Sequence, residues 1–286
     1  MERSIEFERR EYLLIAALLL VALLARLVPG QRIVDDAYIT FRYARNIVEG
    51  NGFVYNRGEH VLGTTTPLYT LILASLSLTT GSQDFPTIAV LFNALSGAAS
   101  VVLLYALCKR IVGHWMPAAV VALLWAVAPY SVTFAIGGME TDLTIALLLA
   151  VSYAHMNAAP RWMAGLSSLA LLARPDTAIL LVLLWMHRIL EQRRVPWREG
   201  AIGLALLAPW LVFGTLTFGS PMPGSIAAKR ATYQLPPGAD LVRLIQHYST
   251  PFFAHEFLGR GWQLVGFTAY LLLCGWGGLR AVRRDR

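Results

Sequence analysis

Long apolar runs constrain this chain more than any other feature of its sequence. Residues 12–28, 87–108 and 143–153 are near or at the ~20 apolar residues that a helix needs to cross ~30 Å of hydrocarbon. The 286-residue chain is 56% hydrophobic and only 14% charged, with a positive mean hydropathy, which does not suit a soluble fold. We therefore predict an all-α protein, a polytopic transmembrane helical bundle.

The order of apolar and charged segments predicts about eight crossings. They are expected at residues 12–28, 87–108, 116–130, 141–157, a tight pair within 162–190, 200–218 and 262–279. With the N-terminus in the cytoplasm, the basic excess behind the net charge of +7 falls on the cytoplasmic side, as the positive-inside tendency expects. The basic residues then reflect the orientation of the chain in the membrane, and no DNA-binding motif accompanies them. We expect a multi-pass protein of the plasma membrane with no nucleic-acid partner.

Two segments depart from simple spans. The stretch 162–190 reads as two short helices meeting at ARPDT (173–177), because Pro175 disfavours a continuous helix there. This arrangement puts Arg174 and Asp176 at the outer surface. The run 66–78 is too short for a comfortable span and predicts a helix lying in the outer interface. The outer loops then cover about 29–86 and about 219–260, and the first is long enough to be functional.

The remaining segments have plain readings. The N-terminal 30 residues could form a cleaved signal peptide, but the apolar run is longer than a usual h-region and no A-x-A-like site follows it, so a retained helix is favoured. Cys108 and Cys274 are far apart and suggest neither a disulfide framework nor a metal site. His60, His247 and His255 show no metal-ligand spacing and read as ordinary loop histidines.

The paired carboxylates Asp35 and Asp36 stand where a helix is expected over residues 36–49, with Gly50 as its C-terminal stop. Polar and apolar side chains take opposite faces of that helix: Tyr38, Arg42, Arg45 and Glu49 against Phe41, Ala44, Ile47 and Val48. One reading is that one aspartate caps the helix and the other interacts favourably with the positive N-terminal end of the helix dipole. The other is that they hold a hard cation, or that one acts as a general base while its neighbour orients a substrate. The two readings are compatible.

A second acidic element occurs in GGMETD (137–142), at the start of the fourth crossing on the same side. It reads either as a Gly-rich turn with acidic residues in the first helical turn or as part of a site shared with Asp35. In the second case Glu140 is the functional carboxylate, and Gly137 and Gly138 let the backbone approach a ligand closely.

Basic residues on the same side have two readings as well. Arg174, Lys229 and Arg230 could be interfacial residues that extend their charged ends toward water. They could instead bind the phosphate of a lipid headgroup, since Arg can grip phosphate oxygens bidentately. Ionisable groups gathered at one edge of a bilayer are functional candidates by default.

Four stretches, in this order, resemble the GT-C superfamily of integral-membrane glycosyltransferases: DDAYITFRYARNIVEGNGFVYNRGEHVLGTTTPLYTLILA (35–74), GGMETD, ARPDT and FGSPMPGSIAAK (218–229). The likeness is to bacterial and actinobacterial members of the arabinofuranosyltransferase and protein-mannosyltransferase type. It covers about 35–229, and the first stretch is its specific element. The resemblance implies a GT-C-like fold, a polyprenyl-phosphate sugar as donor, and a glycan or protein as acceptor.

The resemblance also implies roles for individual residues. Asp35 matches the family's catalytic base or metal-associated carboxylate, with Asp36 as its neighbour, and Glu140 matches a second acidic residue. Four basic residues become candidates for the donor phosphate: Arg174, Lys229, Arg230 and Arg42. A divalent cation (Mg, Mn or Ca) held by Asp35 and Asp36 would be the cofactor. Direct displacement, with Asp35 removing the proton of the acceptor hydroxyl, predicts inversion at the anomeric carbon on the extracytoplasmic side.

The sequence departs from many relatives of this type, which are longer and carry a soluble extracytoplasmic C-terminal domain. This chain stops at AVRRDR, just after the expected last helix. We expect a single transmembrane domain over 1–286 without such a domain, and a partner subunit could then supply acceptor recognition. Two other functions stay open: a transporter or flippase for a lipid-linked solute, and a non-catalytic GT-C-like scaffold or lipid-binding subunit.

Overall fold

The computed structural model describes residues 8–224 and, near the C-terminus, residues 268–269, 271–273, 275–277 and 279–280. The chain divides into two units, Met1–Ala227 and Ala228–Arg286. The described residues of the second unit are all helical, and they lie within or next to the expected last span, 262–279. No described residue in either unit forms a β-strand. The predicted all-α fold is thus confirmed for this part of the chain, whereas the single-domain prediction stays a prediction.

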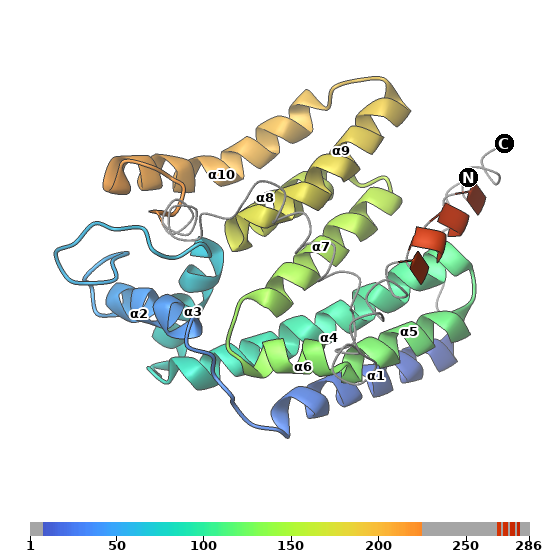
Figure 1. Cartoon of the computed structure of the whole chain (residues 1–286), viewed down its shortest axis with the longest axis horizontal. Helices are drawn as coiled ribbons and strands as arrows, with labels where there is room; N and C mark the ends of the chain where they lie inside the picture. The colour runs from blue at the N-terminus through green and yellow to red at the C-terminus, as the bar shows by residue number, and fades with distance from the viewer. Residues whose placement is uncertain (1–7, 225–267, 270, 274, 278, 281–286) are drawn as a thin grey trace. The chain divides into compact units, whose positions relative to one another are not determined.

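Ten α-helices and one 3-10 helix make up the described part of the first unit (Figure 1). They are α1 (Arg9–Leu27), α2 (Ala37–Val48), α3 (Pro67–Thr80), α4 (Phe85–Val112), α5 (Trp115–Val127), α6 (Pro129–Ile136), α7 (Thr141–Met156), α8 (Pro160–Ala173), η1 (Pro175–Thr177), α9 (Ala178–Gln192) and α10 (Trp197–Phe218).

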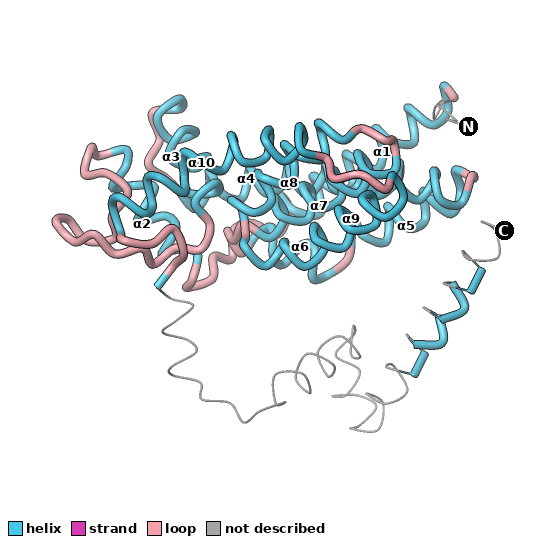
Figure 2. The backbone as a smooth tube through the Cα atoms, turned by 90° about the horizontal axis from the view of Figure 1, so that it is seen from above, coloured by secondary structure: helices cyan, strands magenta, loops and turns pink. Residues whose placement is uncertain are grey.

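Helix α4 is the central element of this unit, because α1, α5 and α7 all pack along it. Small residues permit the close approach: Ala98 of α4, Ala22 of α1 and Ala122 of α5 are buried in one apolar cluster. Helix α8 packs between α7 and α10, and α2 packs on α3. Figure 2 shows α2 and α3 together at one end of the unit.

Two described helices are long and apolar enough to cross a membrane, α4 and α10. Helices α5 and α6 would form a third span if taken together, but they meet at a bend of 46° just before Pro129. Helix α10 has only 6% of its most apolar window buried inside the protein, which suits a helix facing lipid. The described residues therefore support a membrane protein with two or three spans, and the predicted eight crossings are not confirmed.

The segments expected to form helices after the aspartate pair, at 66–78 and around ARPDT are helical, and the side of the membrane on which they lie stays a prediction. Helix α2 begins directly after Asp36 and ends before Gly50, whose φ of +78° is the left-handed conformation of a helix stop. Helix α3 covers the run expected to lie in the interface. Helices α8 and α9 are separated at ARPDT, and the Trp185 indole donates to the Ser167 hydroxyl at 3.2 Å, so α9 folds back on α8.

The two ends of the bundle differ in their charged residues. At one end, Lys109 pairs with Glu11 at 2.8 Å and Arg110 donates to the Met156 carbonyl at 2.8 Å, which joins the C-terminal ends of α4 and α7 to the start of α1. At the other end lie the segment before α2, the turn between α6 and α7, and η1. The predicted acidic residues Asp35, Asp36 and Glu140, together with Arg174, belong to this second end.

Candidate active site

The turn between α6 and α7 is fixed by two buried polar side chains. Asn93 of α4 donates through Nδ2 to the carbonyls of Ala135 (3.2 Å) and Met139 (2.9 Å). Tyr69 of α3 contacts both the Asn93 Oδ1 and the Gly138 carbonyl at 3.1 Å. Asn93 and Tyr69 are fully buried, so these are hydrogen bonds in a dry environment. The turn that leads into Glu140 is therefore held in one conformation.

The segment before the aspartate pair is hydrogen-bonded to this same turn. The Arg32 amide donates to the Ile136 carbonyl at 2.9 Å, and the Val34 amide donates to the Gly137 carbonyl at 3.0 Å. Two parts of the chain about a hundred residues apart in sequence thus run side by side, and the aspartates begin one residue after the second bond. The first and second acidic elements, predicted to share a site, are brought to the same end of the unit.

Gly138 makes this approach feasible. Its φ is +78°, and a Cβ atom there would lie 3.0 Å from Ile33 Cδ1 and 3.1 Å from Phe41 Cζ. A side chain would therefore be strained and would also push the start of α2 away. The glycine pair was expected to let backbone approach a ligand; at Gly138 the close neighbours are the protein's own side chains.

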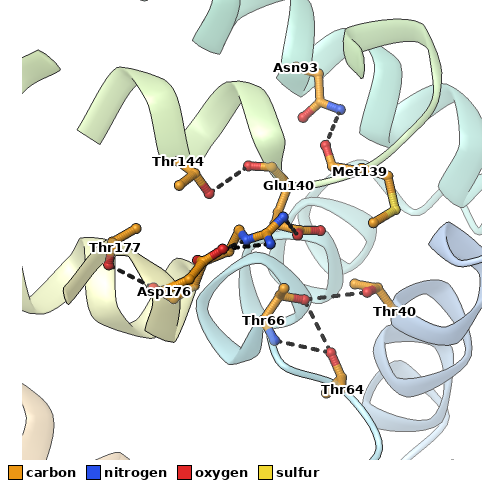
Figure 3. Close-up of polar contacts among 10 residues, drawn as sticks. Thr40, Thr64, Thr66, Asn93, Met139, Glu140, Thr144, Asp176 and Thr177 are labelled. Atoms are coloured by element: carbon orange, nitrogen blue, oxygen red, sulfur yellow. Dashed lines mark hydrogen bonds and ion pairs between the residues drawn. The ribbon is translucent and has the colours of Figure 1, made fainter. Parts of the chain in front are cut away.

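Glu140 is buried, with 3% of its surface exposed, at the N-cap position of α7. Its Oε1 lies 3.2 Å from Arg174 Nη1. Arg174 also forms a two-pronged pair with Asp176, through Nε to Oδ1 at 3.1 Å and Nη2 to Oδ2 at 2.7 Å (Figure 3). One guanidinium thus joins two carboxylates from α7 and η1.

Burial and ion pairing act in opposite directions on the pKa of Glu140, and also on the pKa of Arg174. Burial raises the pKa of Glu140, and its own backbone hydrogen bond and the Arg174 charge oppose that rise without cancelling it. Burial lowers the pKa of Arg174, but the Asp176 hydrogen bond and the Glu140 charge outweigh it, so the pKa of Arg174 is raised and it stays cationic. The expected role of Arg174 at a phosphate stays a prediction, and its donors all face carboxylates in this conformation.

Asp35 and Asp36 are both exposed. Asp36 occupies the N-cap position of α2, but its carboxylate accepts no capping hydrogen bond; the backbone carbonyls of Asp35 and Asp36 accept from Tyr38 (3.0 Å) and Ile39 (3.2 Å) instead. Asp36 therefore stands at the predicted cap position of α2, but its side chain does not form the predicted capping hydrogen bond. Within the described residues, no group of three or more His, Cys, Asp or Glu side chains could hold a metal ion.

Three buried threonines form a hydroxyl cluster that the sequence reasoning did not assign. Thr66 Oγ1 lies 3.1 Å from Thr64 Oγ1 and 3.4 Å from Thr40 Oγ1. Figure 3 draws all three in one close-up with Glu140 and Asp176. The signal for Thr64 and Thr66 was the run GTTTP (63–67), which leads into α3, whereas Thr40 lies apart from it on α2.

A second buried ion pair anchors the first turn of α7. Arg26 Nε lies 3.7 Å from Asp142 Oδ1, and the Arg26 guanidinium donates to the carbonyls of Ala22 and Ala126 and to the Ser131 hydroxyl. Asp142 therefore serves as the partner of an arginine from α1. The available signal was an arginine inside the first apolar run, since charged groups within such runs seek partners.

Of the other predicted phosphate ligands, only Arg42 belongs to the described residues, and it contacts a different part of the chain. Arg42 is exposed and donates through Nε to the Tyr55 carbonyl at 3.1 Å. Lys229 and Arg230 lie outside the described residues, as do His247 and His255. Their predicted roles remain predictions.

Two adjacent apolar pockets open beside the Arg174 segment. The larger, about 470 Å³, is lined mainly by α10 and by α2 with the loop after it, with one residue each from α3 and α8, and the smaller, about 170 Å³, includes Pro175. Both use Leu172 and Trp210, and Leu172 is two residues before Arg174 in the chain. An apolar chain attached to a group at Arg174 could lie against these walls.

No family model matches the chain, and no solved structure matches it. Over 157 residues the chain is 29% identical to the terminal beta-(1->2)-arabinofuranosyltransferase of Mycobacterium tuberculosis. The match covers 52% of this chain but only 23% of that relative. The comparison thus supports a distant likeness to a glycosyltransferase, without indicating a particular member.

Proposed function

We propose that the protein is a membrane glycosyltransferase that moves a sugar from a polyprenyl-phosphate donor to an acceptor hydroxyl, with inversion, on the extracytoplasmic side of the plasma membrane. The observation that carries the proposal is the backbone pairing of residues 32–34 with residues 136–137. It places the segment that ends in the aspartate pair beside the turn that ends in Glu140. The distant likeness to an arabinofuranosyltransferase supports the same reaction class.

Asp35 acts as the general base in this proposal. A neutral hydroxyl is a poor nucleophile, and a positioned base is worth ~10²–10⁴-fold. The hydroxyl proton passes to the carboxylate as the acceptor oxygen bonds to the anomeric carbon, and the bond from that carbon to the phosphate oxygen breaks with its electron pair leaving on the phosphate. Asp35 suits this role because it is exposed, whereas Glu140 is buried against Arg174.

The developing charge on the phosphate requires cations. Arg174 would exchange its exposed two-pronged contact with Asp176 for the phosphate oxygens and keep Glu140 as its anchor. A divalent cation would be held by Asp35 and Asp36, since Mg²⁺ sites of this kind use one or two carboxylates completed by phosphate oxygens and water. When bound, the cation would neutralise charge on the leaving phosphate. Lys229, Arg230 and Arg42 remain further candidates.

The two apolar pockets beside Arg174 would receive the first part of the polyprenyl chain. Helices α3, α8 and α10 contribute to the walls of both pockets, and α10 exposes most of its apolar surface. A lipid chain could therefore pass from the phosphate-binding side chains into the bilayer without crossing polar surface.

The test is transfer of labelled sugar by the purified chain from a panel of polyprenyl-phosphate sugars. Asp35→Asn should reduce turnover by at least ~10²-fold while leaving donor binding intact. Asp84→Asn is the matched control, because Asp84 is likewise an exposed aspartate next to the start of a helix, α4, and Asn can replace it as the cap of α4. Wild-type turnover in Asp35→Asn would remove Asp35 from the mechanism. Donor binding without turnover from any donor would favour the non-catalytic reading.

A further inference from the structure

A third pocket, of about 320 Å³, lies between α2 and the loop that follows it. Its lining is mixed: Ile39, Tyr43, Tyr55, Asn56, Glu59 and Val61. The volume falls at the lower end of the ~300–1,000 Å³ usual for ligand sites. Unlike the two apolar pockets, it presents two phenol rings, an amide and a carboxylate.

The wall of this pocket is pre-organised. Asn46 donates through Nδ2 to the carbonyls of Val54 (2.8 Å) and Tyr55 (2.9 Å), and Asn46 is itself buried. The Tyr43 hydroxyl donates to the Val61 carbonyl at 2.6 Å and accepts from the Gly63 amide at 2.8 Å. Both sides of the loop are thereby attached to α2, so a ligand would meet a formed surface and lose little free energy to ordering it.

The side chains at the pocket suit a sugar ring. Tyr55 packs against Tyr43 with ring centroids 5.9 Å apart, yet 42% of Tyr55 stays exposed, so an aromatic surface is available to the C–H face of a ring. Asn56 donates to Glu59 Oε2 at 3.0 Å, which orients an amide and a carboxylate beside the phenol for hydroxyl groups. The Glu59 charge disfavours a phosphate or another anion in the same place.

The pocket also lies next to the aspartate pair. Ile39 follows Asp35 by four residues and Tyr43 follows by eight, so both stand on α2 about one and two helical turns, or ~6 and ~12 Å, farther along its axis. A glycan chain bound in the pocket could therefore reach Asp35 with a neighbouring unit.

We propose that this pocket binds a neutral glycan chain and, given the proposed transferase activity, holds the acceptor one sugar unit away from the hydroxyl that reacts at Asp35. The acceptor is then a polysaccharide or oligosaccharide. A protein hydroxyl does not need such a pocket.

Binding is tested without any donor, by saturation-transfer NMR on the full chain with a neutral arabino-oligosaccharide and a neutral manno-oligosaccharide as probes. Tyr55→Ala should weaken binding at least 10-fold, Tyr55→Phe should retain it, and Glu59→Gln should weaken it less than Tyr55→Ala. Trp162→Ala is the matched control, an exposed aromatic residue in the first turn of α8 that lines none of these pockets. An unchanged thermal unfolding midpoint for Tyr55→Ala establishes that the variant is folded.

Two results would overturn the glycan site: no binding of either oligosaccharide, or equal binding by Tyr55→Ala and wild type. Its link to catalysis is measured separately, because hydrolysis of the donor by water needs no acceptor. If Tyr55→Ala raises the acceptor KM and leaves donor hydrolysis unchanged, the acceptor role is supported. If no donor is turned over but the oligosaccharide binding depends on Tyr55, the glycan site stands and the transferase proposal fails.

Discussion

Glu140 is buried and forms an ion pair with Arg174, so its ionisation should affect how the stability of the protein depends on pH. Burial raises its pKa in the folded protein, so the folded state holds the proton more tightly than the unfolded state does. The resulting stabilisation is present at low pH and is lost as the pH rises through the folded-state pKa. Glu140→Gln cannot ionise. Its unfolding midpoint should therefore improve relative to wild type as the pH is raised from about 4 to about 8 in one detergent. Parallel curves for the two proteins would contradict this.

At the residue scale, the sequence identified carboxylates and missed what holds them. Asp35, Asp36 and Glu140 were chosen because charged groups beside apolar runs are conspicuous. Asn93 was overlooked, since its acceptors are the carbonyls of Ala135 and Met139, 42 and 46 residues away. Local periodicity carries no information about such partners. The division of Arg174 between two carboxylates was equally inaccessible, although its place beside Asp176 followed from ARPDT.

At the element scale, two helix boundaries followed from local chemistry, one at a proline and one at a glycine. Pro175 separates α8 from η1 and Gly50 follows α2, as predicted. The break between α5 and α6 was missed: residues 116–130 were expected as one span, but the helix ends at Val127 and resumes at Pro129. The apolar run continues through that proline, so hydropathy alone gives no indication of the 46° bend.

The junction between the α6–α7 turn and α2 can be tested by two glycine variants. Gly113 (φ +79°) and Gly138 (φ +78°) have the same left-handed backbone, but a Cβ at Gly113 meets nothing within 4 Å. Gly113→Ala should therefore lose only the ~1–2 kcal/mol of a left-handed alanine. Gly138→Ala adds ~1–3 kcal/mol of overpacking against Ile33 and Phe41 and should also lower sugar transfer. Both variants are compared with wild type by thermal unfolding and by turnover. Equal effects of the two substitutions would show that the close approach of Gly138 to Ile33 and Phe41 is unimportant.

At the scale of the whole molecule, the helical fold class followed from the sequence, and the eight expected crossings stay a prediction. The composition does not suit a soluble fold, and the first unit is helical throughout its described secondary structure. The helices differ, however, in how they would meet lipid: α4 has 56% of its apolar window buried and α10 has 6%. Hydropathy does not distinguish a helix buried in protein from one facing the bilayer, because both are apolar all round. The length and composition of a run therefore do not by themselves determine whether it crosses the membrane.

The proposed orientation can be tested by labelling cysteines introduced at the two ends of the bundle. In a chain with Cys108 and Cys274 replaced by serine, Arg57→Cys lies at the site end and Arg194→Cys between α9 and α10; both arginines are exposed. A membrane-impermeant maleimide should modify the first in intact cells and the second only after permeabilisation. The opposite pattern would place the candidate active site in the cytoplasm and contradict the proposed donor side.

The Arg26–Asp142 pair has a consequence for biosynthesis. The partners are separated by 142 − 26 = 116 residues, so the ribosome completes α1 long before it makes the first turn of α7. At a synthesis rate of ~5–20 residues per second, Asp142 is made ~6–23 s after Arg26. During that interval α1 carries an unneutralised cation near its C-terminal end, where water can still reach it. Final burial of that arginine thus becomes a late event in assembly, completed only when α4 and α7 have joined α1.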